Sequence, residues 1–172
     1  PSISAGGRTG KIECIRPDQL VQWSWEVHND SLCLHHGFDI MPNGNILAII
    51  WELITEVDAL TEGRDPTLLG ASGLWPDKIV EYNPNTGLIE WEWRSWDHMI
   101  QDFDPGAPNY GVVADNPQLF DLNFAPKGTH PDWQHINSVA YNDSLDQIII
   151  CSPVWDEVYI IDHSTTTAEA AG

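Results

Sequence analysis

Residues 132–142 read Asp-Trp-Gln-His-Ile-Asn-Ser-Val-Ala-Tyr-Asn, and they decide how the whole chain is interpreted because a second copy occurs upstream. The upstream copy, residues 36–43, reads His-Gly-Phe-Asp-Ile-Met-Pro-Asn. Aligned on their histidines, the two copies place apolar residues opposite apolar residues and end on an Asn. Each copy then turns through polar residues and enters an apolar run, at 46–50 or 148–150. We infer that one structural unit occurs twice.

Short apolar or alternating runs, separated by turn residues, surround both units and predict β-strands. These runs lie at residues 20–27, 46–53, 78–82, 88–93, 138–141, 147–151 and 158–162. The pair Asn43-Gly44 is a strong hairpin signal because both residues tolerate a positive φ. Repeated units of four antiparallel strands are typical of β-propeller blades. The sequence therefore predicts an all-β fold that forms two to three blades of a β-propeller.

The predicted organisation is a single partial propeller domain over residues 1–172. Its parts are a lead-in at 1–19, the outer strand of a preceding blade at 20–27, a first full blade at 35–93 with an insertion at 54–77, a second insertion at 94–131, and a second blade at 132–167. The insertions contain Gly and Pro and lack strand alternation, so we expect them outside the sheets at one end of the channel. Because a closed propeller has roughly four to eight blades, we expect a fragment that the rest of the propeller or a partner chain completes.

Charge excludes several classes of partner. The chain has 26 acidic residues against 7 Lys and Arg, a formal net charge of −19. Nucleic acids and anionic membranes are poor partners for such a surface. The acidity is explained either by solubility or by a cation site such as one for Ca²⁺, although no Asp-x-Asp-x-Asp-Gly loop is present. The longest apolar run, Ile46 to Trp51, is too short to span a bilayer.

Cysteine and histidine spacing indicates no metal site. Cys14, Cys33 and Cys151 are too scattered for a disulfide framework or a Cys-x-x-Cys zinc site, although one disulfide of unidentified pairing remains open. Seven histidines are present, but none forms a His-x-x-x-His or His-Glu-x-x-His pair. A metal-dependent hydrolase is therefore only a third possibility. A serine hydrolase is excluded by the lack of a Gly-x-Ser-x-Gly turn.

The repeat itself points to a candidate site. His36 and His135 occupy equivalent positions at the start of the innermost predicted strand, so we expect both imidazoles to face one cavity. In an extended strand Asn137 leaves on the same face as His135, while Ile136 turns into the packing. An amide and two imidazoles suit a site that stabilises anionic oxygens. The alternative is that all three are hydrogen-bonded structural residues.

Two motifs resemble the aryl-sulfate sulfotransferase family. One is residues 132–142 followed by Asp-Gln-Ile-Ile-Ile-Cys-Ser at 146–152, and the other is His-His-Gly-Phe-Asp-Ile-Met-Pro-Asn-Gly-Asn-Ile-Leu at 35–47. In outline the resemblance spans residues 20–167. It implies a six-bladed propeller and a periplasmic or secreted location. It also implies transfer of a sulfuryl group from an aryl sulfate to a phenol, with no cofactor and no nucleotide sulfate donor.

The resemblance also implies roles for single residues. By motif match, His36, His135 and Asn137 are catalytic residues that stabilise the transferring group. A further histidine, transiently sulfurylated in this family, is expected on a later blade outside these residues. The family often has an Arg in a Ser-Ser-Arg context, where this chain has Cys151-Ser152-Pro153. The alternative function is therefore a non-catalytic propeller that binds a ligand or protein partner through its insertions.

Overall fold

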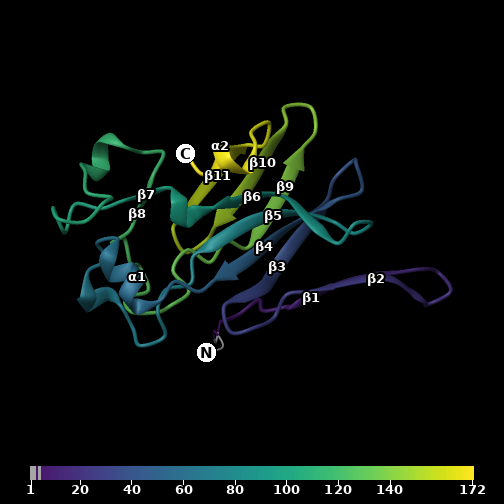
Figure 1. Cartoon of the computed structure of the whole chain (residues 1–172), viewed down its shortest axis with the longest axis horizontal. Coiled ribbons are helices and arrows are strands. Elements are labelled where there is room, and N and C mark those ends of the chain that lie inside the picture. Colours follow the sequence, from purple (N-terminus) through teal and green to yellow (C-terminus); the bar gives the residue numbers. More distant parts are fainter. Residues whose placement is uncertain (1–2, 4) are drawn as a thin grey trace.

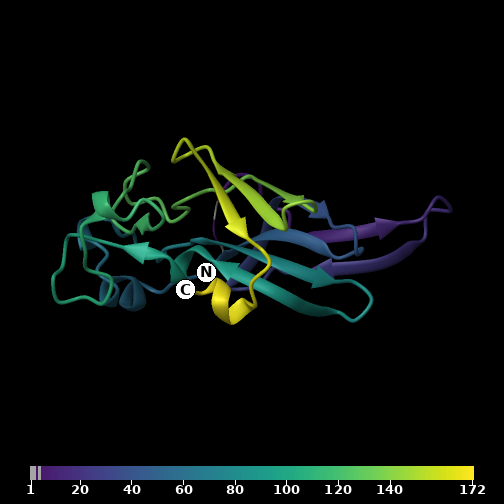
Figure 2. The ribbon, with the colours of Figure 1, turned by 90° about the horizontal axis from the view of Figure 1, so that it is seen from above.

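Eleven strands in four sheets, with little helix, make up the described part of the chain, residue 3 and residues 5–172, in a computed structural model. The predicted all-β class is confirmed. The two larger sheets lie one above the other, and a separate hairpin projects from one side (Figures 1 and 2).

The first large sheet is an antiparallel meander of four strands in sequence order. Its strands are β3 (Leu32–Ile40), β4 (Ile46–Glu52), β5 (Asp77–Asn83) and β6 (Leu88–Arg94). Strand β4 is buried from Ile46 to Trp51, because both faces of the sheet are covered. The predicted hairpin at Asn43-Gly44 is present, and Gly44 has a φ of 86°. This sheet spans residues Leu32 to Arg94.

The second large sheet contains three antiparallel strands. They are β9 (Ser138–Asn142), β10 (Gln147–Ser152) and β11 (Glu157–Asp162), with β10 in the centre. The chain then enters the short helix α2 (Thr167–Ala170), which begins with a capping box formed by Thr166 and Glu169.

One expectation was wrong: residues 1–19 are not only a lead-in. Residues Lys11–Ile15 form β1, which pairs antiparallel with β2 (Val21–Glu26), so β2 belongs to a hairpin. The hairpin buries Ile12 against the first sheet, and Trp25 stacks on Tyr82 with ring centroids 4.1 Å apart. The sequence analysis missed β1 because glycines precede it and because its stability comes from contacts with β2 and the first sheet.

The main core lies between the two large sheets. Leu47, Ile49 and Ile79 of the first sheet share one apolar cluster with Ile148 and Ile150 of the second. Strand alternation explains why Ile148 and Ile150 enter this core and Ile149 does not. The side chain of Ile149 points away from the core and is 46% exposed.

We expect Ile148→Val to lower the free energy of unfolding by about 0.5–1.5 kcal/mol, because it removes one buried methylene from a close-packed core. Chemical denaturation would measure the change. Ile149→Val is the matched control, since it removes the same group from the exposed face of the same strand. Equal losses in the two variants would contradict the assigned orientation of β10.

Polar contacts fix the two sheets relative to one another. His163 binds Glu81 of β5 through Nε2 at 3.0 Å and Asp146 through Nδ1 at 2.8 Å. Asp39 of β3 accepts a hydrogen bond of 2.8 Å from the backbone N–H of Tyr141 in β9. These contacts set β3 beside β9, the two strands next to the candidate site.

The two insertions add no separate strand to the large sheets, although β5 begins at Asp77 and β6 ends at Arg94. Both insertions lie together at one end of the molecule (Figure 1). Their elements are α1 (Glu56–Thr61), η1 (Pro66–Leu68), η2 (Ser95–Asp97), β7 (Met99–Ile100), η3 (Val113–Asp115) and β8 (Phe120–Asp121). The buried guanidinium of Arg64 ties them together by donating to the carbonyls of Leu122 and Leu68. Their place at a channel mouth stays a prediction.

Two further features bear on the expectations from sequence. Cys14, Cys33 and Cys151 are all free thiols. Within the described ranges, no helix combines the length and apolar character that a membrane span requires.

Candidate functional site

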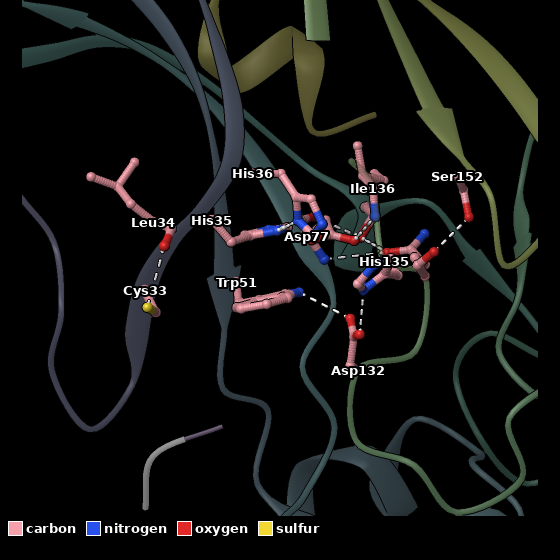
Figure 3. A network of polar contacts seen from close by, with 12 residues as sticks. Cys33, Leu34, His35, His36, Trp51, Asp77, Asp132, His135, Ile136 and Ser152 are labelled. Carbon is pink, nitrogen blue, oxygen red and sulfur yellow. Dashed lines mark hydrogen bonds and ion pairs between the residues drawn. The ribbon is translucent and has the colours of Figure 1, made fainter. Parts of the chain in front are cut away.

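The two repeated histidines share an unusual backbone conformation. His36 has a φ of 51° and His135 a φ of 54°, both in the left-handed region that few residues other than glycine adopt. His36 lies in a bulge of β3, where the pairing register shifts between Leu34 and Phe38. The result is that an imidazole of β3 meets one from the segment before β9, with ring centroids 4.6 Å apart and planes at 84° (Figure 3).

The left-handed conformation also corrects the argument used for Asn137. Residues 135–137 are not an extended strand, so alternation cannot place Asn137 on the face of His135. The structure buries Ile136 completely, as predicted, and leaves the Asn137 side chain exposed. The backbone N–H of Asn137 donates to the carbonyl of Cys151 at 3.0 Å, and Gly37 lies close to its carbonyl. Among the described residues, the Asn137 amide has no hydrogen-bond partner, so it is available to a ligand.

A third histidine, His35, connects His36 to a buried carboxyl. His35 Nδ1 lies 2.9 Å from His36 Nδ1, and His35 Nε2 lies 2.8 Å from Asp77 Oδ1. The approach to Asp77 is not that of a regular hydrogen bond, and neither atom has another hydrogen-bond partner among the described residues. The other oxygen of Asp77 accepts the backbone N–H of Ile136 at 2.9 Å. Asp77 therefore joins the first sheet to the segment that carries His135.

His135 has its own carboxylate partner. Its Nδ1 contacts Oδ2 of Asp132, and Oδ1 of Asp132 accepts the indole N–H of Trp51 at 3.1 Å. The Trp51 ring stacks on His35 with centroids 3.7 Å apart and planes 2° apart. We call His35, His36, Trp51, Asp77, Asp132 and His135 the histidine cluster. Each of its three imidazoles is held by a contact that limits its rotation (Figure 3).

The segment that carries Asp132 and His135 is itself anchored. Gln134 accepts hydrogen bonds through its side chain from Ser95 Oγ at 2.6 Å and from the backbone N–H of Asp77 at 3.2 Å. The Ser152 hydroxyl donates to the Gln134 carbonyl. All of these groups are buried, so the approach of β5 to residues 132–136 is fixed by hydrogen bonds as well as by packing.

The N-terminal segment approaches His36 closely. Gly7 has a φ of 82°, and a Cβ at this position would lie 2.1 Å from His36 Cε1. The carbonyl of Gly7 also accepts the backbone N–H of His36. Only glycine fits here, both for its conformation and for the space that the imidazole occupies.

Burial controls protonation in the cluster. It lowers the pKa of His35 to about 3. Burial, together with the charges of His35 and His135, lowers the pKa of His36 to about 4. Burial raises the pKa of Asp77 well above its usual value. At neutral pH, His35 and His36 are therefore uncharged, and each offers one N–H donor and one lone pair.

The structure adds residues that the sequence argument did not assign to a site. Asp77, Asp132, Trp51, Lys127 and His35 are not among the site residues proposed above. Lys127 Nζ lies 3.4 Å from Asp132 Oδ2, and the Lys127 side chain is 34% exposed. A signal existed for Asp132, which lies three residues before His135 within the repeated motif. No local signal marked Asp77, because its partners come from other strands.

The cluster's chemistry is that of proton exchange and hydrogen bonding to anions. In the described part of the chain, no group of three or more His, Cys, Asp or Glu side chains is arranged to hold a metal ion. Uncharged imidazoles, a free amide and one lysine can donate hydrogen bonds to anionic oxygens.

Comparison with known proteins gives one positive result. The family model described as arylsulfotransferase (ASST) matches residues 21–169, which include both sheets and the whole histidine cluster. No curated protein matches the chain.

Proposed function

The chain belongs to the arylsulfotransferase family, and from this premise we propose that its histidine cluster transfers a sulfuryl group from an aryl sulfate to a phenol. The observation that carries the proposal is the meeting of His36 and His135. They come from equivalent repeat positions, one in β3 and one in the segment before β9, yet their ring centroids lie 4.6 Å apart. Packing alone does not require two partly exposed imidazoles to meet in this way.

Sulfuryl transfer requires donors that hold oxygen atoms as charge moves between them. His36 and His135 supply such donors from fixed backbone positions, and we propose that the exposed amide of Asn137 turns toward the same oxygen atoms. Preorganised donors stabilise developing charge because they need no reorganisation during the reaction. Asp132 supports this role by fixing the ring of His135 and leaving its Nε2 for the substrate.

Lys127 supplies positive charge where the family's Arg is replaced by Pro153. Its ammonium group lies 3.4 Å from the carboxylate that holds His135. It is partly exposed and comes from an insertion, so it can turn toward a bound sulfate ester. We propose that Lys127 attracts the anionic substrate to the cluster against the negative charge of the protein.

Lys127→Met should raise KM for an aryl sulfate by about 10-fold, which corresponds to the loss of one partly exposed charge-assisted contact of roughly 1.4 kcal/mol. Steady-state kinetics at low ionic strength would measure the change. Arg16→Met is the matched control, because Arg16 pairs with Asp18 at the far turn of the β1–β2 hairpin. An equal KM increase in both variants would show a general charge effect and contradict a local role.

The proposal extends to the architecture. The two large sheets are blades of a six-bladed propeller, and β3 and β9 are their innermost strands. Ile149, Val158 and Ile160 are exposed on the outer face of the second sheet, where a further blade would pack. The substrates are a small aryl sulfate and a phenol, and the location is periplasmic or secreted.

The test is transfer from 4-nitrophenyl sulfate to a phenolic acceptor by the full-length protein, without any nucleotide sulfate donor. We expect release of 4-nitrophenol and formation of the acceptor's sulfate ester, followed by absorbance and mass spectrometry. Absence of the sulfated acceptor with a range of phenols would contradict the function.

One observation favours the alternative, a non-catalytic propeller that binds a ligand or a protein through its insertions. Pro153 stands where the family often has an arginine, so one charged group of the transfer site is absent from that position. Saturable binding of an aryl sulfate without turnover by the full-length protein would support this alternative.

A further inference from the structure

We propose that Asp77 and His35, which do not reach the substrate, act through His36 as a proton relay that protonates the leaving phenolate and later accepts the proton of the acceptor phenol. This inference rests on the proposed sulfuryl transfer and deepens it. His36 is then the residue that exchanges a proton with the substrate, and the other two are positioning residues.

The geometry provides a line of close contacts, of which the inner one, between Asp77 and His35, has an ion-pair distance but not the angles of a regular hydrogen bond. Asp77 Oδ1 lies 2.8 Å from His35 Nε2, and His35 Nδ1 lies 2.9 Å from His36 Nδ1. His36 Nε2 is held by no hydrogen bond within the described residues. We place the substrate oxygen at this end of the path, where Gly7, which has no side chain, lies beside the ring. The side chains of Asp77 and His35 are fully buried, so bulk water does not exchange protons with them directly.

The contact between the two Nδ1 atoms couples the tautomers of the histidines. Two neutral imidazoles in such a contact share one proton, so one ring donates and the other accepts. If Asp77 is protonated, it donates to His35 Nε2, His35 donates to His36, and His36 carries its proton on Nε2. If Asp77 is ionised, every proton shifts by one position and His36 presents a lone pair at Nε2. The protonation of one buried carboxyl thus decides what His36 offers to the substrate.

Burial favours the protonated state of Asp77. Burial raises the pKa of Asp77 and lowers that of His35, and both effects favour an uncharged pair. Trp51, stacked on the His35 ring, adds an apolar wall that favours the same state. Before the reaction, His36 therefore presents an N–H donor toward the substrate.

The proton balance closes over the two halves of the reaction. In the first half, the S–O bond of the donor breaks as the sulfuryl group passes to the enzyme nucleophile. The leaving phenolate takes the proton of His36 Nε2, while His36 Nδ1 takes the proton of His35 and His35 Nε2 takes that of Asp77. The negative charge then rests on Asp77, where the backbone N–H of Ile136 and the His35 N–H hold it. In the second half, the acceptor phenol attacks sulfur and its proton returns along the same path.

Asp77→Asn is the informative variant, because the amide can still donate to His35 Nε2 but has no proton to give. It preserves the tautomer of His36 and blocks the relay. We expect transfer from phenyl sulfate, a poor leaving group, to fall by about 10²–10³-fold, within the usual range of general acid catalysis. Transfer from 4-nitrophenyl sulfate, whose leaving group needs little protonation, should fall less than about 10-fold by the same reasoning. Asp115→Asn, at an exposed position in an insertion, is the control and should leave both rates unchanged.

A second measurement is independent of activity. Proton-coupled ¹⁵N NMR of histidine-labelled full-length protein at neutral pH should show His36 protonated on Nε2 in both the wild type and Asp77→Asn. His35→Gln should lose this preference. The relay would be overturned if Asp77→Asn lowered the transfer rates from phenyl sulfate and from 4-nitrophenyl sulfate equally. It would also be overturned if wild-type His36 were protonated on Nδ1. If the wild type transfers no sulfuryl group, the proposed function fails, and the tautomer measurement alone decides whether Asp77 and His35 orient His36.

Discussion

His135→Ala should lower the turnover of sulfuryl transfer by about 10²–10³-fold, the usual effect of removing one preorganised donor. His135 is held by Asp132, and its side chain is only 18% exposed, so it is aimed before the substrate arrives. The variant leaves Asp132 with Trp51 and Lys127 as partners. We therefore expect the free energy of unfolding to fall by only about 1–3 kcal/mol, the cost of one weakened buried polar contact.

Single-turnover and steady-state rates, with denaturation curves on the same samples, would separate the two effects. His28→Ala is the control, because His28 is exposed and lies outside the histidine cluster. Turnover within a few-fold of wild type in a folded His135→Ala protein would eliminate this residue from the mechanism, whatever its position in the structure.

Asp77→Asn should make the stability of the protein fall as the pH drops from about 6.5 to 4.5, by about 2–3 kcal/mol more than in the wild type. The folded pKa of His35, about 3, lies below its unfolded value of 6.5. Below pH 6.5 the unfolded chain thus binds one more proton at this residue, and acid favours unfolding. The slope for one such group is about 1.4 kcal/mol per pH unit.

In the wild type, Asp77 opposes the pH dependence of stability that His35 contributes. Its folded pKa lies well above its unfolded value of 3.8, so above that pH the folded chain holds one more proton at Asp77. Stability from this group alone would fall as the pH rises. As long as folded Asp77 keeps its proton, the pair binds one proton in both the folded and the unfolded chain between about pH 4 and 6.5, so the two effects offset each other.

The opposite variant provides the control. In His35→Gln only Asp77 remains, and stability relative to the wild type should fall as the pH rises. Urea denaturation at pH 4.5, 5.5 and 6.5 would measure both slopes, with the contributions of His36 and the surface carboxylates common to all three proteins. Parallel stability curves for the three proteins would contradict the uncharged Asp77–His35 pair.

The sequence predicted much of the fold because the signals were local. Alternation and turn residues indicated the strands of both large sheets, and Asn43-Gly44 indicated a hairpin that is present. Strand β1 was missed because its pattern is short and its stability depends on contacts with Trp25 and the first sheet. A propensity argument cannot register a partner surface that forms only on folding.

The sequence likewise predicted only part of the candidate site. The repeat alone paired His36 with His135, and the structure brings their rings together. The placement of Asn137 rested on alternation, which fails because His135 adopts a left-handed backbone conformation. His135 lies where the insertion leads into β9.

The sequence by itself determined the strand pattern, the all-β class and the equivalence of the two histidines, since each follows from the order of neighbouring residues. The tertiary structure alone decided the surroundings of those histidines. Asp77 lies far along the chain from both His35 and Ile136, yet it contacts both. Trp51 of β4 reaches Asp132 in the segment before β9. Burial shifts the pKa values of Asp77 and His35, and burial exists only once the sheets have packed, because in the unfolded chain water would screen these groups from one another.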